Sequence, residues 1–175
     1  MKKGLNTKAM VRCALFAALI CVLSPFSIQI GPVPITISLF AVMLCGVTLD
    51  WRGAGLAVLV YLLIGLIGLP VFSGGKGGAA VIVGPTGGYI WAYLPMAVLI
   101  SIFTRKGGYV RAAIVCALSL LLCYGLGTLQ FCLVANYTFG AALAVCVWPF
   151  VPFDIAKSVC AALLGTRLRR LPSAN

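Results

Sequence analysis

Long apolar runs, separated by short breaks rich in glycine, proline or charged residues, cover most of the 175-residue chain. About 20 consecutive apolar residues are enough for a helix to cross the ~30 Å hydrocarbon core of a bilayer. We therefore predict an all-α polytopic membrane protein, with six transmembrane helices that form one substrate-binding domain over residues 1–175. The predicted spans lie at about residues 9–25, 35–49, 53–72, 88–104, 112–136 and 151–168.

Three connecting segments do not fit a regular membrane-spanning helix. Residues 29–34 carry Gly31, Pro32 and Pro34, and residues 73–88 form a long glycine-rich connection. Residues 139–150 are apolar, but twelve helical residues cover only ~18 Å, at about 1.5 Å per residue. We interpret this third segment as a re-entrant or interfacial cap, because irregular backbone at membrane depth needs protein or a cavity around it.

The positions of the cations predict the orientation of the spans. With six spans and a cytoplasmic N-terminus, eleven of the thirteen cations lie inside, as the positive-inside rule favours. Lys76 is then the outside loop cation, and Lys157 lies within the last span. We expect both termini in the cytoplasm and a multi-pass protein of the cytoplasmic membrane, since a seventh span would export the cations of residues 167–170.

Composition supports a membrane protein and argues against several other classes. The chain is 63% hydrophobic and 9% charged, with a mean hydropathy of +1.17. Its net charge of +11 does not indicate nucleic-acid binding, because the cations sit at the ends of apolar runs. The eight cysteines lie in apolar runs and the chain has no histidine, so we expect no metal site. The basic, apolar N-terminus lacks the small residues of a signal-peptide cleavage site and is interpreted as the first span.

An acid and a base stand inside the last apolar run. Asp154 and Lys157 are three residues apart, which places them on one face of a helix. A charge at membrane depth costs about 2.5 to 3.5 kcal/mol on insertion scales, so such residues usually face a cavity. Either they form a structural ion pair, or they line a polar ligand site. The ligand site is favoured, because Asp50 and Asp154 are the chain's only acids.

The topology brings the three irregular segments and Asp154 to the outer face, where they define an outward-facing pocket. The glycine-rich stretch at residues 74–78 lacks the spacing of a phosphate-binding loop. No nucleophile with a matching base is evident, so we expect neither an enzyme nor a bound cofactor. The small residues Ala14 and Ala18 lie four apart in the first span, a spacing that allows another helix to approach closely.

Several motifs together resemble the BioY biotin transporters. These motifs are Gly31-Pro-Val-Pro-Ile-Thr36, Leu66-Ile-Gly-Leu-Pro-Val-Phe72, the two glycine pairs of residues 74–78, Gly84-Pro-Thr-Gly-Gly-Tyr89 and Pro152-Phe-Asp154-Ile-Ala-Lys157. The resemblance runs over nearly the whole chain. It implies the fold of a substrate-binding S component of an energy-coupling factor transporter, with biotin as substrate. ATP would be hydrolysed by partner ATPases that act through a transmembrane T component, which docks at Ala14 and Ala18.

The resemblance also implies roles for the candidate site residues. Asp154 would accept a hydrogen bond from a ureido N–H of biotin, and Lys157 would donate to its carbonyl. The candidates for an apolar wall around the ligand are Val33, Phe72, Tyr89 and Trp91. The candidates for binding the carboxylate are Lys76 or the amides of Gly75 and Gly77. The alternatives are an S component for another small vitamin, or a self-contained secondary transporter. The sequence leaves open whether the chain acts alone as a homo-oligomer.

Overall fold

The computed structural model describes residues 7–29 and 33–170. Almost all of its regular structure is helical. The elements are α1 (Thr7–Leu23), β1 (Ser27–Gln29), β2 (Pro34–Thr36), α2 (Ser38–Thr48), α3 (Trp51–Leu66), the 3-10 turn η1 (Ser73–Gly75), α4 (Ala79–Val83), α5 (Gly87–Thr104), α6 (Tyr109–Ala135), α7 (Phe139–Cys146) and α8 (Val151–Arg170). A helix is therefore present in each of the six segments predicted as spans.

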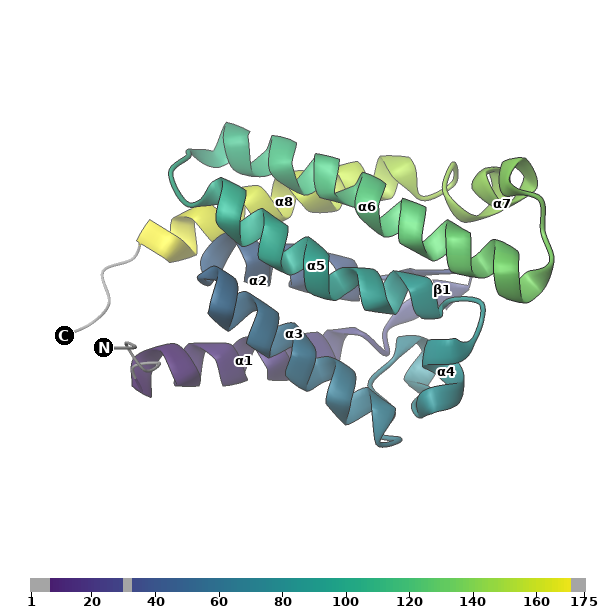
Figure 1. Ribbon diagram of the computed structural model, residues 1–175. Coiled ribbons are helices and arrows are strands. Elements are labelled where there is room, and N and C mark those ends of the chain that lie inside the picture. The colour runs from purple at the N-terminus through teal and green to yellow at the C-terminus, as the bar shows by residue number, and fades with distance from the viewer. Residues whose placement is uncertain (1–6, 30–32, 171–175) are drawn as a thin grey trace.

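The long helices lie side by side along one direction (Figure 1). The start of α1, the end of α8 and the turns α2–α3 and α5–α6 share one end of the bundle, called here the terminal end. The β1–β2 strands, α4 and α7 lie at the opposite end, called here the loop end. This arrangement separates the segments predicted to be cytoplasmic from those predicted to form the pocket.

Helix α2 is the centre of the packing. All of its residues except Phe40 and Thr48 are buried, and it contacts α1, α3, α5 and α8. A helix that is apolar on every side is expected to be enclosed by others. Close approach of α8 depends on Gly165, where an added Cβ would lie 2.7 Å from Cγ1 of Val47.

Length separates the helices into two groups. Within residues 7–29 and 33–170, α5 and α6 are long and apolar enough to cross a membrane, and α7 with α8 forms a pair bent by 58° that could count as a third span. Helices α2 and α3 are apolar but shorter. The outward side chains of α6 are largely apolar, with Leu118, Leu121 and Leu129 more than half exposed. The number of six spans stays a prediction.

Two helix boundaries differ from the sequence prediction. Helix α3 ends at Leu66 rather than near residue 72, because Gly68 adopts φ +104° and Pro70 cannot continue a helix. Helix α2 starts at Ser38 rather than at residue 35. Residues 34–36 instead form a strand, so the second predicted span was too long.

The residues on either side of positions 30–32 form two paired strands, called here the hairpin, which the sequence analysis did not predict. Strands β1 and β2 pair antiparallel, with Ser27 opposite Thr36 and Gln29 opposite Pro34. Gly31 and Pro32 of the predicted irregular segment lie outside the described residues. The hairpin lies at the loop end (Figure 1).

The glycine-rich connection is held in place by hydrogen bonds and contains α4. The Gly74 amide donates to the Pro25 carbonyl at 3.1 Å, and the Gly78 amide donates to the Gly65 carbonyl at 2.7 Å. Nε2 of Gln130 on α6 donates to the Ile82 and Gly84 carbonyls at 2.9 and 2.8 Å. The connection is thus attached to α3, to α6 and to the residues that follow α1, and it positions Lys76 at the loop end.

Candidate substrate-binding site

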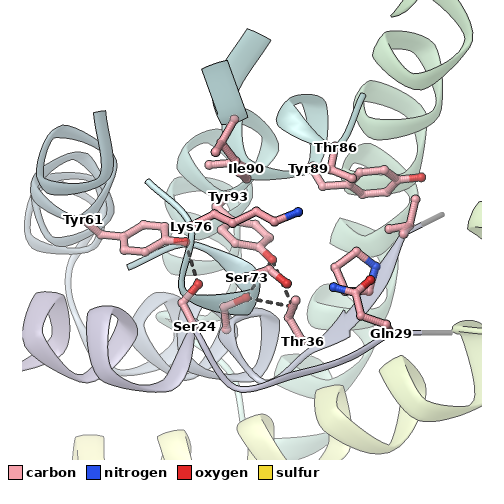
Figure 2. A pocket seen from close by; sticks show the side chains of 14 residues that line it. Ser24, Gln29, Thr36, Tyr61, Ser73, Lys76, Thr86, Tyr89, Ile90 and Tyr93 are labelled. Atoms are coloured by element: carbon pink, nitrogen blue, oxygen red, sulfur yellow. Dashed lines mark hydrogen bonds between the residues drawn. The ribbon is translucent and has the colours of Figure 1, made fainter. Parts of the chain in front are cut away.

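The loop end contains a cavity of about 60 Å³, called here the Lys76 chamber. The hairpin, the glycine-rich connection and α5 contribute most of its walls. Its lining residues are Ser24, Gln29, Val33, Pro34, Thr36, Ser38, Tyr61, Ser73, Lys76, Val81, Thr86, Tyr89, Ile90 and Tyr93. Figure 2 shows that the ammonium group of Lys76 points into this chamber.

A second cavity of about 40 Å³, called here the Asp154 chamber, adjoins the first. Its lining residues are Val33, Pro34, Ile35, Thr36, Leu39, Tyr89, Tyr93, Cys123, Tyr124, Cys146, Phe150, Asp154 and Lys157. Five residues line both chambers: Val33, Pro34, Thr36, Tyr89 and Tyr93. The two chambers therefore meet at β2 and at two tyrosines of α5.

Asp154 and Lys157 form an ion pair that is tied to two other elements. The Lys157 Nζ donates to Asp154 Oδ1 at 2.8 Å and to the backbone carbonyl of Thr36 on β2 at 2.9 Å. The Tyr124 hydroxyl of α6 donates to Asp154 Oδ2 at 2.7 Å. Because an ammonium has three N–H donors, one donor of Lys157 remains for a ligand. The carboxylate oxygens also keep lone pairs that can accept from a ligand.

Hydroxyl groups orient the tyrosines at the boundary between the chambers. Ser38 Oγ lies 2.9 Å from the Tyr93 hydroxyl and donates to Thr36 Oγ1 at 2.8 Å. The Tyr61 hydroxyl lies 2.7 Å from Ser24 Oγ on the far side of the Lys76 chamber. Figure 2 shows these rings facing the chamber from different elements. The boundary is thus both aromatic and polar, and its rings are held in fixed positions.

The glycine-rich connection supplies two polar groups to the Lys76 chamber. Lys76 is exposed, and the Ser73 hydroxyl oxygen is buried without a hydrogen-bond partner among the described residues. A buried hydroxyl without a partner costs about 1 to 3 kcal/mol, so a ligand that accepts from it would be favoured. A cation beside a hydroxyl donor suits a carboxylate.

The structure brings together five of the predicted site residues. Val33 and Tyr89 line both chambers, Lys76 lines one, and Asp154 and Lys157 line the other. They come from four segments of the chain, since Asp154 and Lys157 share α8, and these segments meet at the loop end.

Four other predicted residues do not line either chamber. Phe72 is fully buried and packs edge-on against Tyr61 with ring centroids 5.5 Å apart, so it supports the wall from behind. Trp91 is half exposed and lies on the outer surface beside α6. Gly75 and Gly77 flank Lys76, and Gly77 packs against the backbone of residues 68 and 69. Phe72 and Trp91 therefore do not contribute to the lining of either chamber.

The sequence analysis missed Tyr124 and Tyr93. A tyrosine within an apolar span needs a partner for its hydroxyl, and this requirement could have drawn attention to Tyr124. Tyr93 follows Tyr89 by four residues, so both rings lie on the same helix face. Thr36 was also missed, because its contribution to the ion pair is a backbone carbonyl.

The proposed docking face of α1 is accessible. Ala14 and Ala18 are exposed, whereas Cys13, Ala17 and Ile20 face the bundle. The exposed face also carries large apolar side chains, including Met10, Leu15 and Val22. Small residues between large apolar ones provide a surface on which a second membrane helix can pack.

Comparison with known proteins gives the family. The model of the BioY family matches residues 1–174. The chain belongs to the BioY family. A biotin transporter BioY from Thermotoga maritima is 38% identical over 167 residues, which cover 94% of this chain and 97% of that protein. The biotin transporter BioY2 from Lactococcus lactis is 40% identical over 169 residues, covering 94% and 93%.

A solved structure of an S-component has the same fold. The crystal structure of the S-component for biotin from an ECF-type ABC transporter matches with a TM-score of 0.84 and 28% identity, and covers 95% of each chain. The S-component fold expected from the sequence is confirmed. The transporter relatives and the apolar helices identify the chain as a membrane protein. No group of three potential metal ligands occurs within residues 7–29 and 33–170.

Proposed function

We propose that this BioY-family chain binds biotin in an outward-facing pocket and mediates its high-affinity uptake across the cytoplasmic membrane. The observation that carries the proposal is the pair of adjoining chambers, with a cation in one and the Asp154–Lys157 ion pair in the other. The relatives named as biotin transporters, over 94% of the chain, support the same substrate.

The chemistry of biotin fits the order of polar groups along the two chambers. Biotin has a carboxylate at one end and, at the other, a ureido group with two N–H donors and a carbonyl. Lys76 and the Ser73 hydroxyl are suited to the carboxylate, while Asp154 and the remaining N–H of Lys157 are suited to the ureido group. Tyr89 and Tyr93 flank the boundary through which the apolar part of the ligand would pass.

Binding in this pocket requires the chambers to widen. Both cavities are far below the roughly 300 Å³ that is usual at the lower end of ligand pockets. Strand β2 separates them and is joined to α8 by the hydrogen bond from Lys157 to the Thr36 carbonyl. We expect biotin, bound through the remaining N–H of Lys157, to displace β2 and so widen the chambers.

Titration of labelled biotin against the purified chain tests this function. Saturable binding that unlabelled biotin displaces is the expected result. Absence of saturable binding to the folded protein would overturn the proposal. Displacement by a different vitamin at much lower concentration would favour the alternative, an S component with another substrate.

We also propose that transport is energised by partner subunits, with a T component docking on the face of Ala14 and Ala18. The variant Ala14→Leu/Ala18→Leu should lose co-purification with a T component, because bulky side chains prevent close helix approach. Biotin binding should remain, since both residues are on α1, outside the two chambers. A matched control is Leu15→Ile, which changes shape on the same exposed surface without adding volume.

Unchanged complex formation by the double leucine variant would exclude this docking face. A transporter that works as a homo-oligomer would instead be recognised by uptake in cells that lack a T component.

Our proposed topology places the terminal end in the cytoplasm and Lys76 outside. Labelling of intact cells with an impermeant amine reagent should modify Lys76 and leave Lys8 and Lys106 unlabelled. A Lys76→Gln variant provides the control, because it should lose the label. Labelling of Lys8 or Lys106 in sealed cells, with Lys76 protected, would reverse the orientation.

A further inference from the structure

A larger cavity lies at the terminal end, away from both chambers of the loop end. It has a volume of about 350 Å³, within the roughly 300 to 1,000 Å³ usual for ligand pockets. Its polar lining residues are Lys8, Arg12, Thr48, Asp50, Arg105 and Arg169. They come from α1, the α2–α3 turn, the end of α5 and the end of α8.

The charge of this cavity is strongly unbalanced. Four of its lining residues are cations, and Asp50 is the one acid among them. The chain's other acid, Asp154, lies in the Asp154 chamber and pairs with Lys157. Cations gathered in a concave, low-dielectric site attract an anion more strongly than the same charges spread over a surface.

The bundle holds one of these cations in a fixed position. The Arg169 guanidinium donates to the Thr104 carbonyl at 2.7 Å and to the Gly107 carbonyl at 2.8 Å. Those two bonds use two of its five N–H donors, so others remain available to a ligand. The guanidinium is therefore positioned by the end of α5 without being neutralised by a carboxylate.

A hydroxyl group provides a second, independent indication of a ligand. The Thr48 Oγ1 is buried and has no hydrogen-bond partner among the described residues, although Thr48 lines this cavity. A buried donor of this kind is costly unless something accepts from it. A phosphate group has oxygens for both the guanidinium and the hydroxyl, and charge-assisted hydrogen bonds of this type are the strong ones.

Aromatic side chains indicate the depth of the cavity in the membrane. Trp51 and Tyr109 begin α3 and α6 at the terminal end, and they are 48% and 57% exposed. The Arg52 guanidinium lies 5.1 Å from the centre of the Trp51 ring. Tryptophan and tyrosine gather at the level of the lipid headgroups, and basic pockets between membrane helices bind anionic headgroups.

We propose that this cavity binds a phosphate group, supplied by an anionic phospholipid of the adjacent leaflet. Arg12, Arg105 and Arg169 surround the phosphate, and the Thr48 hydroxyl, which is buried at the cavity wall, turns to donate to one of its oxygens. The bound headgroup bridges α1, α5 and α8 at the end where their positive charges otherwise repel one another. Inorganic phosphate shares this chemistry and is the alternative source.

The test uses the full-length chain in phosphatidylcholine nanodiscs with increasing fractions of phosphatidylglycerol. Bound phosphatidylglycerol is counted by native mass spectrometry, and the midpoint of thermal unfolding is measured in parallel. Arg12→Gln/Arg105→Gln should need about 30-fold more phosphatidylglycerol for the same occupancy, at about 1 kcal/mol per cation. Both arginines are exposed, so their loss should leave the fold intact.

The matched control is Arg167→Gln/Arg170→Gln, which removes the same charge from the same end outside the lining of the cavity. The control should bind phosphatidylglycerol like the unmodified chain. Equal losses in the two double variants, or no loss in either, would overturn the proposal. If neither double variant lost phosphatidylglycerol binding, the cations of the cavity would instead be assigned to an acidic segment of a partner protein.

A further arm separates the two sources of phosphate. Inorganic phosphate is added to the chain in nanodiscs of phosphatidylcholine alone. Stabilisation that requires Arg12 and Arg105 supports a phosphate site open to the solvent. Stabilisation by phosphatidylglycerol but not by inorganic phosphate supports a lipid site, and stabilisation by neither overturns both.

Discussion

Asp154→Ala is expected to weaken biotin binding by about 10- to 150-fold, which corresponds to the loss of one charge-assisted hydrogen bond worth about 1.5 to 3 kcal/mol. The substitution has a compound effect, because the carboxylate accepts from both Lys157 and Tyr124. Without it, Lys157 is left as an uncompensated charge, which is destabilising in a low-dielectric wall. The measurement is titration of labelled biotin against the folded variant.

Two further variants separate recognition from folding. Asp154→Ala/Lys157→Met removes both charges and should regain stability relative to Asp154→Ala, because no unpaired charge remains. Biotin binding should still be lost if the ion pair contacts the ligand. Wild-type affinity in this folded double variant would assign the ion pair a purely structural role, as a link between α8 and β2.

Tyr124→Phe provides the graded member of the series. It removes one hydroxyl donor to Asp154 and leaves the charge pair intact. The net contribution of such a bond is about 0.5 to 1.5 kcal/mol, so we expect a loss of about 10-fold or less. A larger loss than that of Asp154→Ala would contradict the central role of the carboxylate.

The second large effect is expected from Gly77→Ala in the glycine-rich connection. An added Cβ would overlap the Leu69 carbonyl oxygen and lie 2.7 Å from the Gly68 carbonyl oxygen. Both atoms belong to the backbone, so the connection must shift as a whole. Over-packing of this kind costs about 1 to 3 kcal/mol. The shift should also move the neighbouring Lys76 and weaken binding of the biotin carboxylate.

Gly125→Ala is the matched control for this prediction. Gly125 lies within α6, and an added Cβ there meets no heavy atom within 4 Å. Alanine is favoured over glycine in a helix by up to about 1 kcal/mol, so this variant should be at least as stable as the unmodified chain. Thermal unfolding in detergent and biotin titration should separate the two variants. Equal unfolding midpoints would mean that the close packing at Gly77 carries no energetic cost.

The sequence by itself determined the helical class, the positions of the main helices and the importance of Asp154 and Lys157. Apolar runs in a chain with two acids leave few alternatives, because an unpaired charge or an unsatisfied backbone group is costly at membrane depth. The spacing of Asp154 and Lys157 on one helix face also predicted that they could pair, and the structure joins them at 2.8 Å.

Only the tertiary structure decided which groups surround that pair. The Tyr124 hydroxyl bonds to Asp154, 30 residues further along the chain, and the Thr36 carbonyl bonds to Lys157, 121 residues further along. No local sequence pattern encodes contacts of that range. Helix α2 could likewise be recognised as apolar, but its enclosure by four helices depends on how they pack. The orientation of Trp91 also depends on the tertiary structure. An aromatic ring on an apolar helix can face a chamber or the lipid, and the packing of α5 against α6 turns the ring of Trp91 outward.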